Sequence, residues 1–272
     1  MSASAPSALA YRIGEIARAA GDAIMAVYRG DFAVQTKADA SPLTAADLAA
    51  QRVILAGLSE LDPLLPILSE EAKALPWPER QHWSRYWLVD PLDGTREFIK
   101  RNGEFTVNIA LIDQRQSVLG AVLAPVTGEL YLAERGHGAW LQVQADGEWQ
   151  RIGTRPLRQP PLVAGSRSHG GPQRSLLEQL VGSDYELAPL GSSLKFCLIA
   201  RGAADVYLRL GLTSEWDTAA AQCVLEEAGG ALLDLAGSPF RYNRGESLLN
   251  PEFIAVGDST LDWAARLQAM QR

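Results

Sequence analysis

Residues 86–95 read Tyr-Trp-Leu-Val-Asp-Pro-Leu-Asp-Gly-Thr, an apolar run followed directly by two carboxylates three residues apart. The run predicts a short buried strand that ends at Asp90, where the proline stiffens a turn and the glycine allows close backbone approach. Asp90, Asp93 and the Leu92 carbonyl are oxygen ligands of the kind that magnesium prefers. Thr95 has the chemistry of a helix N-cap, so the amides after it could face a phosphate. Aspartate-proline and aspartate-glycine are also ordinary turn signals, so the turn alone leaves a plain loop open.

Two further acidic segments lie at the edges of apolar or helical segments. Glu70 and Glu71 follow the apolar stretch 64–68, and Asp217 precedes a run, 219–228, that is typical of a helix. The sequence alone does not separate Glu70 from Glu71, and Asp217 could equally be a helix N-cap. Carboxylates from three separate elements would repel one another strongly unless cations offset their charge. With the pair in the turn, the set predicts the site of a magnesium-dependent phosphatase.

Composition limits the class of protein. The 272 residues are 47% apolar, enough for a substantial core in one large domain or two closely packed halves. The net charge of -7 argues against a nucleic-acid polymer or an acidic lipid surface as the main partner. A small anion remains allowed, because bound cations invert the local field. Cys197 and Cys223 lie in apolar helical segments and are interpreted as core thiols in a reducing compartment.

The first ten residues contain no basic region followed by an apolar stretch, so no secretion signal is expected. No apolar run approaches the roughly 18 residues that a membrane-spanning helix needs. We therefore expect a cytoplasmic protein, with peripheral contact to the cytoplasmic face of the inner membrane left open.

The hydrophobic pattern divides the chain into two parts. Apolar spacing of three and four predicts an amphipathic helix over 9–27, and a second helix opens at Thr44 and runs to about residue 61. An antiparallel meander follows, with strands at 105–112, 117–124, 129–133, 139–143 and 148–152. Alternating strands and helices are then expected at 162–165, 173–181, 185–189, 193–201, 204–209, 217–228, 231–235, 253–257 and 259–271. The segment 151–161, with three arginines and two prolines at its end, is the expected boundary between an N-terminal half, 1–155, and a C-terminal half, 156–272.

The acidic motifs resemble those of the inositol monophosphatase superfamily, which comprises lithium-sensitive, magnesium-dependent phosphatases. The resemblance lies in the pair Glu70-Glu71, in WLVDPLDGTREF at 87–98 and in WDTAA at 216–220. Within the superfamily the chain looks most like the CysQ-type 3'(2'),5'-bisphosphate nucleotidases. The stretches that carry this closer likeness are 37–47, 68–71, 90–112, 165–169, 191–220 and 247–251. The resemblance implies a mixed α+β and α/β fold, the layered αβαβα sandwich of the inositol monophosphatase and sugar phosphatase type, with the active site between the halves.

The resemblance also implies roles for individual residues. Two or three Mg²⁺ ions per site would be held by Glu70, Asp90, the Leu92 carbonyl, Asp93 and Asp217. Glu70 and Thr95 would contact the nucleophilic water, and Thr95 would pass its proton toward Asp47. Asp47 has a second interpretation, because Thr44 and Asp47 match a capping box in which the carboxylate is occupied structurally. Asp39 competes for the same catalytic role, although the context Thr-x-Ala-Asp favours Asp47.

Substrate choice is where neighbouring families differ. Inositol phosphatases usually read DGTTNF and GSAALN where this chain has DGTREF and GSSLK. A lysine just inside a helix, as Lys195 would be, is electrostatically unfavourable unless an anion lies nearby, and the 5'-phosphate of a bisphosphate would supply that anion. Ser166 and His169 match positions that contact the nucleotide in related enzymes, while a loop histidine without a role is the other interpretation. The full set of expected substrate contacts is Glu70, Leu92, Gly94, Thr95, Ser166, His169, Gly191, Lys195 and Asp217.

These observations predict an enzyme that removes the 3'-phosphate from 3'-phosphoadenosine 5'-phosphate by metal-activated water, giving AMP and phosphate in support of sulfate assimilation. The expected partner is a small bisphosphate nucleotide, and the oligomeric state stays open. One alternative is the same chemistry on an inositol monophosphate or a sugar bisphosphate. Another is a non-catalytic nucleotide or metal sensor, which would have no need to keep the whole carboxylate set.

Overall fold

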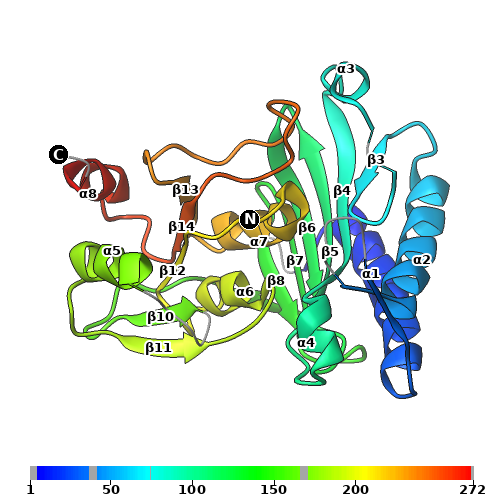
Figure 1. Cartoon of the computed structure of the whole chain (residues 1–272), viewed down its shortest axis with the longest axis horizontal. Helices are drawn as coiled ribbons and strands as arrows, with labels where there is room; N and C mark the ends of the chain where they lie inside the picture. The colour runs from blue at the N-terminus through cyan, green and yellow to red at the C-terminus, as the bar shows by residue number, and fades with distance from the viewer. Residues whose placement is uncertain (1–4, 37–41, 74, 166–170, 271–272) are drawn as a thin grey trace.

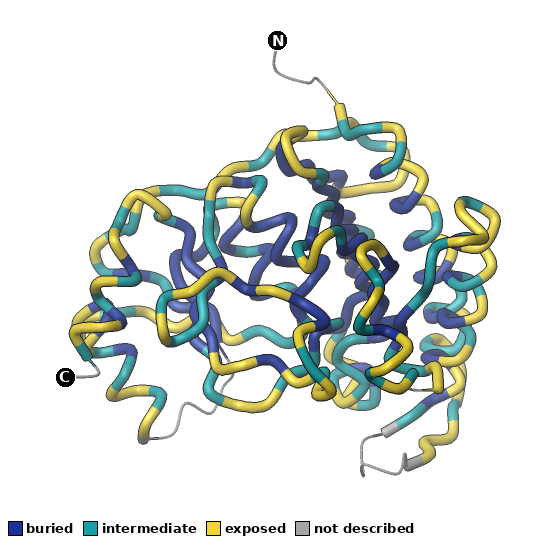
Figure 2. The backbone as a smooth tube through the Cα atoms, turned by 90° about the horizontal axis from the view of Figure 1, so that it is seen from above, coloured by how far each residue is buried: buried dark blue, intermediate teal, exposed yellow. Residues whose placement is uncertain are grey.

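The structure of the chain is a computed structural model that describes residues 5–36, 42–73, 75–165 and 171–270. Two large sheets alternate with layers of helices (Figure 1). Buried residues run along the strands in the middle of the molecule, and exposed residues lie mainly on the outer loops and helix faces (Figure 2). None of the helices in the described part of the chain is long and apolar enough to cross a membrane.

The first sheet has seven strands in the order β3-β4-β5-β6-β7-β8-β9. Their bounds are Ile67–Ser69, Arg85–Asp93, Thr106–Asp113, Gln116–Leu123, Leu130–Glu134, Gly138–Gln142 and Gln150–Ile152. β3 pairs with β4 in parallel, and each later strand pairs antiparallel with the one before it. The predicted meander from β5 to β9 is confirmed, with strand ends shifted by one or two residues.

Helices cover both faces of this sheet. Helices α1 (Ala8–Tyr28) and α2 (Ala45–Leu61) pack on one face, where Trp87 and Val89 of β4 join their core. Helix α7 (Ala219–Glu227) packs on the other, where Tyr86 and Leu88 point. Because successive strand residues alternate between faces, an uninterrupted apolar run in β4 requires cover on both sides. The two predicted N-terminal helices are confirmed, and Thr44 is the N-cap of α2.

The second sheet has five strands in the order β11-β10-β12-β14-β13. Their bounds, in chain order from β10, are Leu162–Gly165, Glu186–Pro189, Val206–Arg209, Ala231–Asp234 and Phe253–Val256. Helix α6 (Leu194–Ala200) lies on its inner face beside α7, while α5 (Gly171–Val181) and α8 (Trp263–Ala269) cover the outer face. The layers therefore follow the order α, β, α, β, α (Figure 1).

Short elements complete the chain. A two-stranded sheet pairs β1 (Val34–Thr36) with β2 (Pro42–Thr44), and α3 (Trp77–Arg80), α4 (Thr95–Ile99) and the 3₁₀ turn η1 (Glu215–Asp217) lie in connections. The chain passes from the first sheet to the second between β9 and β10. Since α7 packs on the first sheet although it follows β12, the division into halves at 155/156 stays a prediction.

Three local expectations were wrong. β4 does not end at Asp90 but continues to Asp93, with an irregular register against β5 between these residues. Thr95 is not the N-cap of α4, because that position belongs to Gly94 at φ 96°, a left-handed conformation that favours glycine. Helix α8 begins at Trp263 rather than at 259, because the Asp262 side chain accepts the N–H of Ala265 and caps the helix there.

A glycine sets the distance between α7 and the first sheet. A Cβ added at Gly120 in β6 would lie 2.1 Å from the carbonyl oxygen of Ala220 in α7. Gly120→Ala should therefore push α7 away and lower the free energy of unfolding by about 1–3 kcal/mol, measured by urea titration. Gly245→Ala is the control, since no atom lies within 4 Å of its Cβ position. An unchanged midpoint for Gly120→Ala would contradict this packing.

Candidate active site

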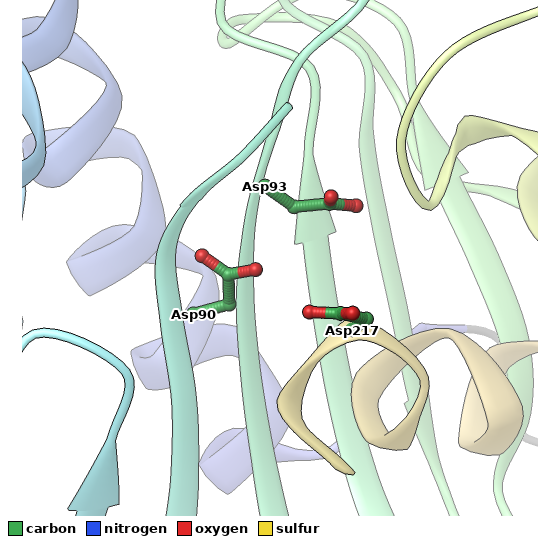
Figure 3. A group of neighbouring side chains, drawn as sticks. All are labelled: Asp90, Asp93 and Asp217. Atoms are coloured by element: carbon green, nitrogen blue, oxygen red, sulfur yellow. The ribbon is translucent and has the colours of Figure 1, made fainter. Parts of the chain in front are cut away.

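Three aspartates from two distant segments meet at the junction of β4 and η1. The ligand oxygens of Asp90, Asp93 and Asp217 all lie within 4.8 Å of one another (Figure 3). Residues three apart on a regular strand point to opposite faces. The irregular register of β4 between Asp90 and Asp93 removes that conflict, so both carboxylates serve one site.

Burial of these like charges is the main electrostatic feature of the site. Asp90 is only 1% exposed, and burial, followed by the charges of Glu70, Asp93 and Asp217, raises its pKa well above the usual range. Burial and the charge of Asp93 raise the pKa of Asp217 to about 8. A hydrogen bond with Glu70 also raises the pKa of Asp90, so the structure brings the predicted Glu70 into the cluster. Its backbone N–H donates to the carbonyl of Val89, which holds Glu70 beside β4.

Donors from the second half of the chain fix two of these carboxylates. The N–H and hydroxyl of Ser193 lie 2.6 and 2.9 Å from Asp93 Oδ2, and the N–H of Ser214 donates to Asp217 Oδ2 at 2.8 Å. The bond from Ser214 belongs to a capping box around η1 in which Ser214 is the N-cap and Asp217 is the third residue. The N-cap of α7 is Thr218, so the expectation that Asp217 is itself an N-cap was wrong. One Asp217 oxygen thus has a structural partner, while the carboxylate still faces the other two aspartates.

The turn that carries Asp217 is held by a network that the sequence interpretation missed. The backbone N–H of Asn243 donates to both oxygens of Glu215, at 2.8 and 3.0 Å. The buried Arg80 donates from Nη1 to Asn243 Oδ1 at 2.6 Å. Burial raises the pKa of Glu215 to about 7. The glutamate two positions before Asp217 was visible in the sequence, but no local pattern pointed to its partners.

The carboxylate of Asp47 contacts both Thr44, the N-cap of α2, and Thr95, which lies shortly after Asp93. Its Oδ2 accepts the N–H and the hydroxyl of Thr44, both at 2.7 Å, and its Oδ1 accepts the hydroxyl of Thr95 at 3.2 Å. The capping box is therefore present, yet it uses one oxygen only and fixes the other toward Thr95. The Thr95 hydroxyl also lies 3.4 Å from the Leu92 carbonyl oxygen, so the structure brings Asp47, Thr95 and Leu92 together.

A cavity of about 450 Å³ opens beside Asp93 and Asp217. Its lining includes Gly94, Gly191 and Lys195, all predicted to bind substrate. Gly191 approaches its neighbours closely: its N–H donates to the side chain of Glu104 at 2.9 Å, and a Cβ there would lie 2.8 Å from the Glu104 carbonyl oxygen. The positive charges of Arg96 and Lys100 line the same cavity.

Lys195 is a buried cation inside α6. It is 7% exposed, and its Nζ donates to the carbonyls of Leu190 and Ser192 and lies 5.1 Å from the centre of the Tyr207 ring. Burial lowers its pKa to about 8, although the charge of Asp93 acts in the opposite direction. Its hydrogen-bond partners are carbonyls, and no carboxylate ion pair is found within the described ranges, so the ammonium group can still donate to an anion, although the charges of Asp93, Glu97 and Glu104 compensate part of its own.

Arg209 is a further cavity residue that the sequence interpretation missed. It ends β12, and its guanidinium donates to the carbonyls of Gly211 and Leu212 at 3.2 and 3.3 Å. Its charge lowers the pKa of Lys195, so the two cations act on the same space. The signal in the sequence was an arginine at a strand end shortly before Asp217.

Three expectations lie outside the described residues: Asp39, Ser166 and His169. The strand β10 ends at Gly165, immediately before the second of them. Their roles stay predictions.

The donor set fits a hard divalent cation. The three clustered side chains offer carboxylate oxygens only, and the cluster that the described residues form contains neither histidine nor cysteine. Such oxygen sites suit magnesium, calcium or manganese rather than zinc or copper. Buried carboxylates that repel one another gain most from a cation, so Glu70, Asp90, the Leu92 carbonyl, Asp93 and Asp217 fit the group that they are predicted to hold.

Comparisons with known proteins show the family and the fold of the chain. Residues 8–267 match the sequence model of the Inositol monophosphatase family. The 3'(2'),5'-bisphosphate nucleotidase CysQ of Escherichia coli (strain K12) is 51% identical over 245 residues, which cover 89% of this chain and 97% of that protein. The crystal structure of CysQ from Bacteroides thetaiotaomicron matches with a TM-score of 0.78 at 40% identity, over 92% of this chain and 97% of the other. The extragenic suppressor protein suhB of Bartonella henselae matches with a TM-score of 0.77 at 26% identity, over 98% and 99%. The predicted fold class is confirmed.

The raised pKa values predict how stability depends on pH when a chelator removes divalent cations. Asp217 has a pKa of about 8 in the folded chain and 3.8 as its usual value, so its contribution is complete below about pH 4 and is lost as the pH rises through 8. The free energy of unfolding in EDTA should therefore fall by on the order of a few kcal/mol between pH 5 and pH 8, measured by urea titration.

Saturating Mg²⁺ should reverse most of that loss at pH 8, because a bound cation stabilises the ionised carboxylates. Asp217→Asn is the matched control and should show a flatter pH profile in EDTA. A wild-type stability that does not change with pH in EDTA would contradict the buried repulsion.

Proposed function

The chain belongs to the inositol monophosphatase family, and from that membership we propose that it is a magnesium-dependent 3'(2'),5'-bisphosphate nucleotidase. The proposed reaction removes the 3'-phosphate of 3'-phosphoadenosine 5'-phosphate and yields AMP and phosphate. The observation that carries the proposal is the position of the buried aspartate cluster beside a cavity whose cationic residues include Lys195 and Arg209.

The carboxylates of Glu70, Asp90, Asp93 and Asp217, with the Leu92 carbonyl, would hold the metal ions, two or three per site. Magnesium at such a site supplies a water of lowered pKa and polarises the phosphoryl oxygens. Neighbouring residues hold these carboxylates in place: the N–H and hydroxyl of Ser193 donate to Asp93 Oδ2. The capping box orients the Asp217 carboxylate in the same way.

Proton removal is assigned to Thr95 and Asp47. The Thr95 hydroxyl donates to Asp47 Oδ1, so its own lone pairs can accept a proton from a water held with Glu70 while it passes its proton to Asp47. The bonds from Thr44 to Asp47 Oδ2 prevent the carboxylate from turning away. In this proposal the cap and the catalytic role support each other, because each uses a different oxygen.

The second phosphate of the substrate is assigned to Lys195 and Arg209. Two cations that repel each other in one cavity are stabilised by an anion between them, and a substrate with a single phosphate at the metal ions leaves them without one. This favours a bisphosphate over an inositol monophosphate. The cavity volume of about 450 Å³ lies in the range of small-ligand sites, roughly 300–1,000 Å³. Contacts from Ser166 and His169 to the nucleotide belong to the same proposal.

The cellular role follows from this substrate. We place the enzyme in sulfate assimilation, in the cytoplasm, with lithium sensitivity as in the superfamily that it resembles. Both cysteines are free and buried, which supports a reducing compartment. Hydrolysis of inositol monophosphates or sugar bisphosphates is the alternative. A panel of 3'-phosphoadenosine 5'-phosphate, inositol 1-phosphate and fructose 1,6-bisphosphate with Mg²⁺ tests the proposal, and a preference for either of the last two would overturn it.

Asp90→Asn and Asp93→Asn should each remove nearly all turnover, because each withdraws a charged oxygen from the metal site. Phosphate release from 3'-phosphoadenosine 5'-phosphate at saturating Mg²⁺ is the measurement. Both variants should still fold, since relief of repulsion offsets the lost contacts, and circular dichroism checks this. Near wild-type turnover in either folded variant would mean that the metal assignment is wrong.

Lys195→Met should reduce kcat/KM on 3'-phosphoadenosine 5'-phosphate by about 10- to 100-fold, the equivalent of about 1.5–3 kcal/mol for a charge-assisted contact. Activity on adenosine 3'-monophosphate should change little, because that substrate has no 5'-phosphate to lose. Lys100→Met, which removes a different cation from the same cavity lining, is the matched control. An equal loss on both nucleotides would assign Lys195 to the shared site or to the fold.

A further inference from the structure

One buried amide beside the metal site lacks a hydrogen-bond partner. Asn108 in β5 is 1% exposed, and neither its Oδ1 nor its Nδ2 has a partner among the described residues. Buried polar side chains are nearly always paired, so an unpaired amide calls for a ligand, an ion or a bound water. An amide with both a donor and an acceptor unpaired is the more unusual case.

The sheet register places this amide next to Asp90. Asn108 and Asp90 are cross-strand partners in the antiparallel pair β4 and β5. Side chains of such partners point to the same face, with Cβ atoms about 4.5–5.5 Å apart. Leu88 and Ala110, two positions away, belong to the core shared with α7. The amide therefore lies on the face where Asp217 approaches Asp90.

Neighbouring residues do not satisfy the amide. On its other side Asn108 pairs with the apolar Val122 of β6. Asp90 accepts the N–H of Leu92 at 3.0 Å and shares a hydrogen bond with Glu70. These bonds of Asp90 do not involve the Asn108 amide. Of the two strand neighbours of Asn108, only Asp90 is polar, so the amide has polar groups near it only on the side of the carboxylate cluster.

We propose that Asn108 is part of the metal site and that its amide binds a water molecule of the hydration shell of the cation held by Asp90. Magnesium keeps several water molecules when proteins bind it, and an amide can both donate to and accept from such a water. The inference rests on the metal part of the proposed function and does not depend on the substrate. It makes Asn108 a positioning residue, because it acts through the water on the cation.

The test compares stability without cations and affinity for Mg²⁺ in the same variants. Asn108→Leu keeps the branching of the side chain at Cγ and removes both unpaired groups, so the melting temperature in EDTA should rise. Its Mg²⁺ affinity, measured by titration calorimetry without substrate, should fall by about 10- to 100-fold, as for other residues that orient a metal shell. Asn108→Asp should show the opposite pattern: a lower melting temperature in EDTA, because it adds another buried carboxylate, and a Mg²⁺ affinity that is kept or increased.

A partnered polar residue on the same face is the matched control. The hydroxyl of Ser117 in β6 is buried and donates to the carbonyl of Ala219 in α7 at 2.7 Å. Ser117→Ala should lower the melting temperature and leave the Mg²⁺ affinity unchanged. A fall in melting temperature for Asn108→Leu with wild-type Mg²⁺ affinity would overturn the inference alone. Absence of Mg²⁺ binding by the wild-type protein would overturn the inference and the proposed function together.

Discussion

The structure depends on how it accommodates like charges that are buried where β4 meets η1. Asp90, Asp93 and Asp217 lie within reach of one ion, and burial makes their repulsion strong. The surrounding chain is arranged to hold them there: β4 breaks its register between the first two, and Ser193 donates to the second. Gly120 in β6 lets α7 pack directly on the sheet, and α7 follows Asp217 in the chain. The groups that destabilise the cation-free chain are thus the groups that are proposed to bind the cation.

The cavity beside the cluster shows the complementary arrangement. Lys195 is buried with carbonyls and an aromatic ring around it, and Arg209 donates to loop carbonyls. Each cation has enough partners to stay in place, and neither has a carboxylate salt bridge in the described portion, although the charges of Asp93, Glu97 and Glu104 act on Lys195. Carboxylates that can hold cations and cationic side chains that can bind an anion therefore lie side by side. In the proposed function, cations held by the carboxylates bind one phosphate of the substrate, and Lys195 and Arg209 bind the other.

The sequence patterns predicted those features of the fold that depend on interactions between residues close in the chain. The strands of the meander and the helix at 9–27 follow from side-chain periodicity, and the carboxylates of the site follow from their positions at strand and helix ends. The backbone conformation at helix ends was not predicted correctly. Gly94, and not Thr95, is the N-cap of α4, because the backbone there adopts a left-handed conformation that favours glycine. The positions of Asn108 and Arg209 depend on strand register and on cavity shape, which no short stretch of sequence contains. The capping interpretation of Asp47 is confirmed and uses one carboxylate oxygen, while the other oxygen accepts the Thr95 hydroxyl, so the catalytic role stays a prediction.

The most direct test of this account is a crystal structure with Mn²⁺ in place of Mg²⁺, recorded at a wavelength where manganese scatters anomalously. The account predicts anomalous peaks at the cluster, each bound by oxygens from Asp90, Asp93 or Asp217, in crystals of protein that hydrolyses 3'-phosphoadenosine 5'-phosphate with Mn²⁺ in solution. Manganese suits this test because it accepts the same oxygen ligands as magnesium. Active protein whose crystals show no peak at these aspartates, or a peak at another site only, would contradict the account.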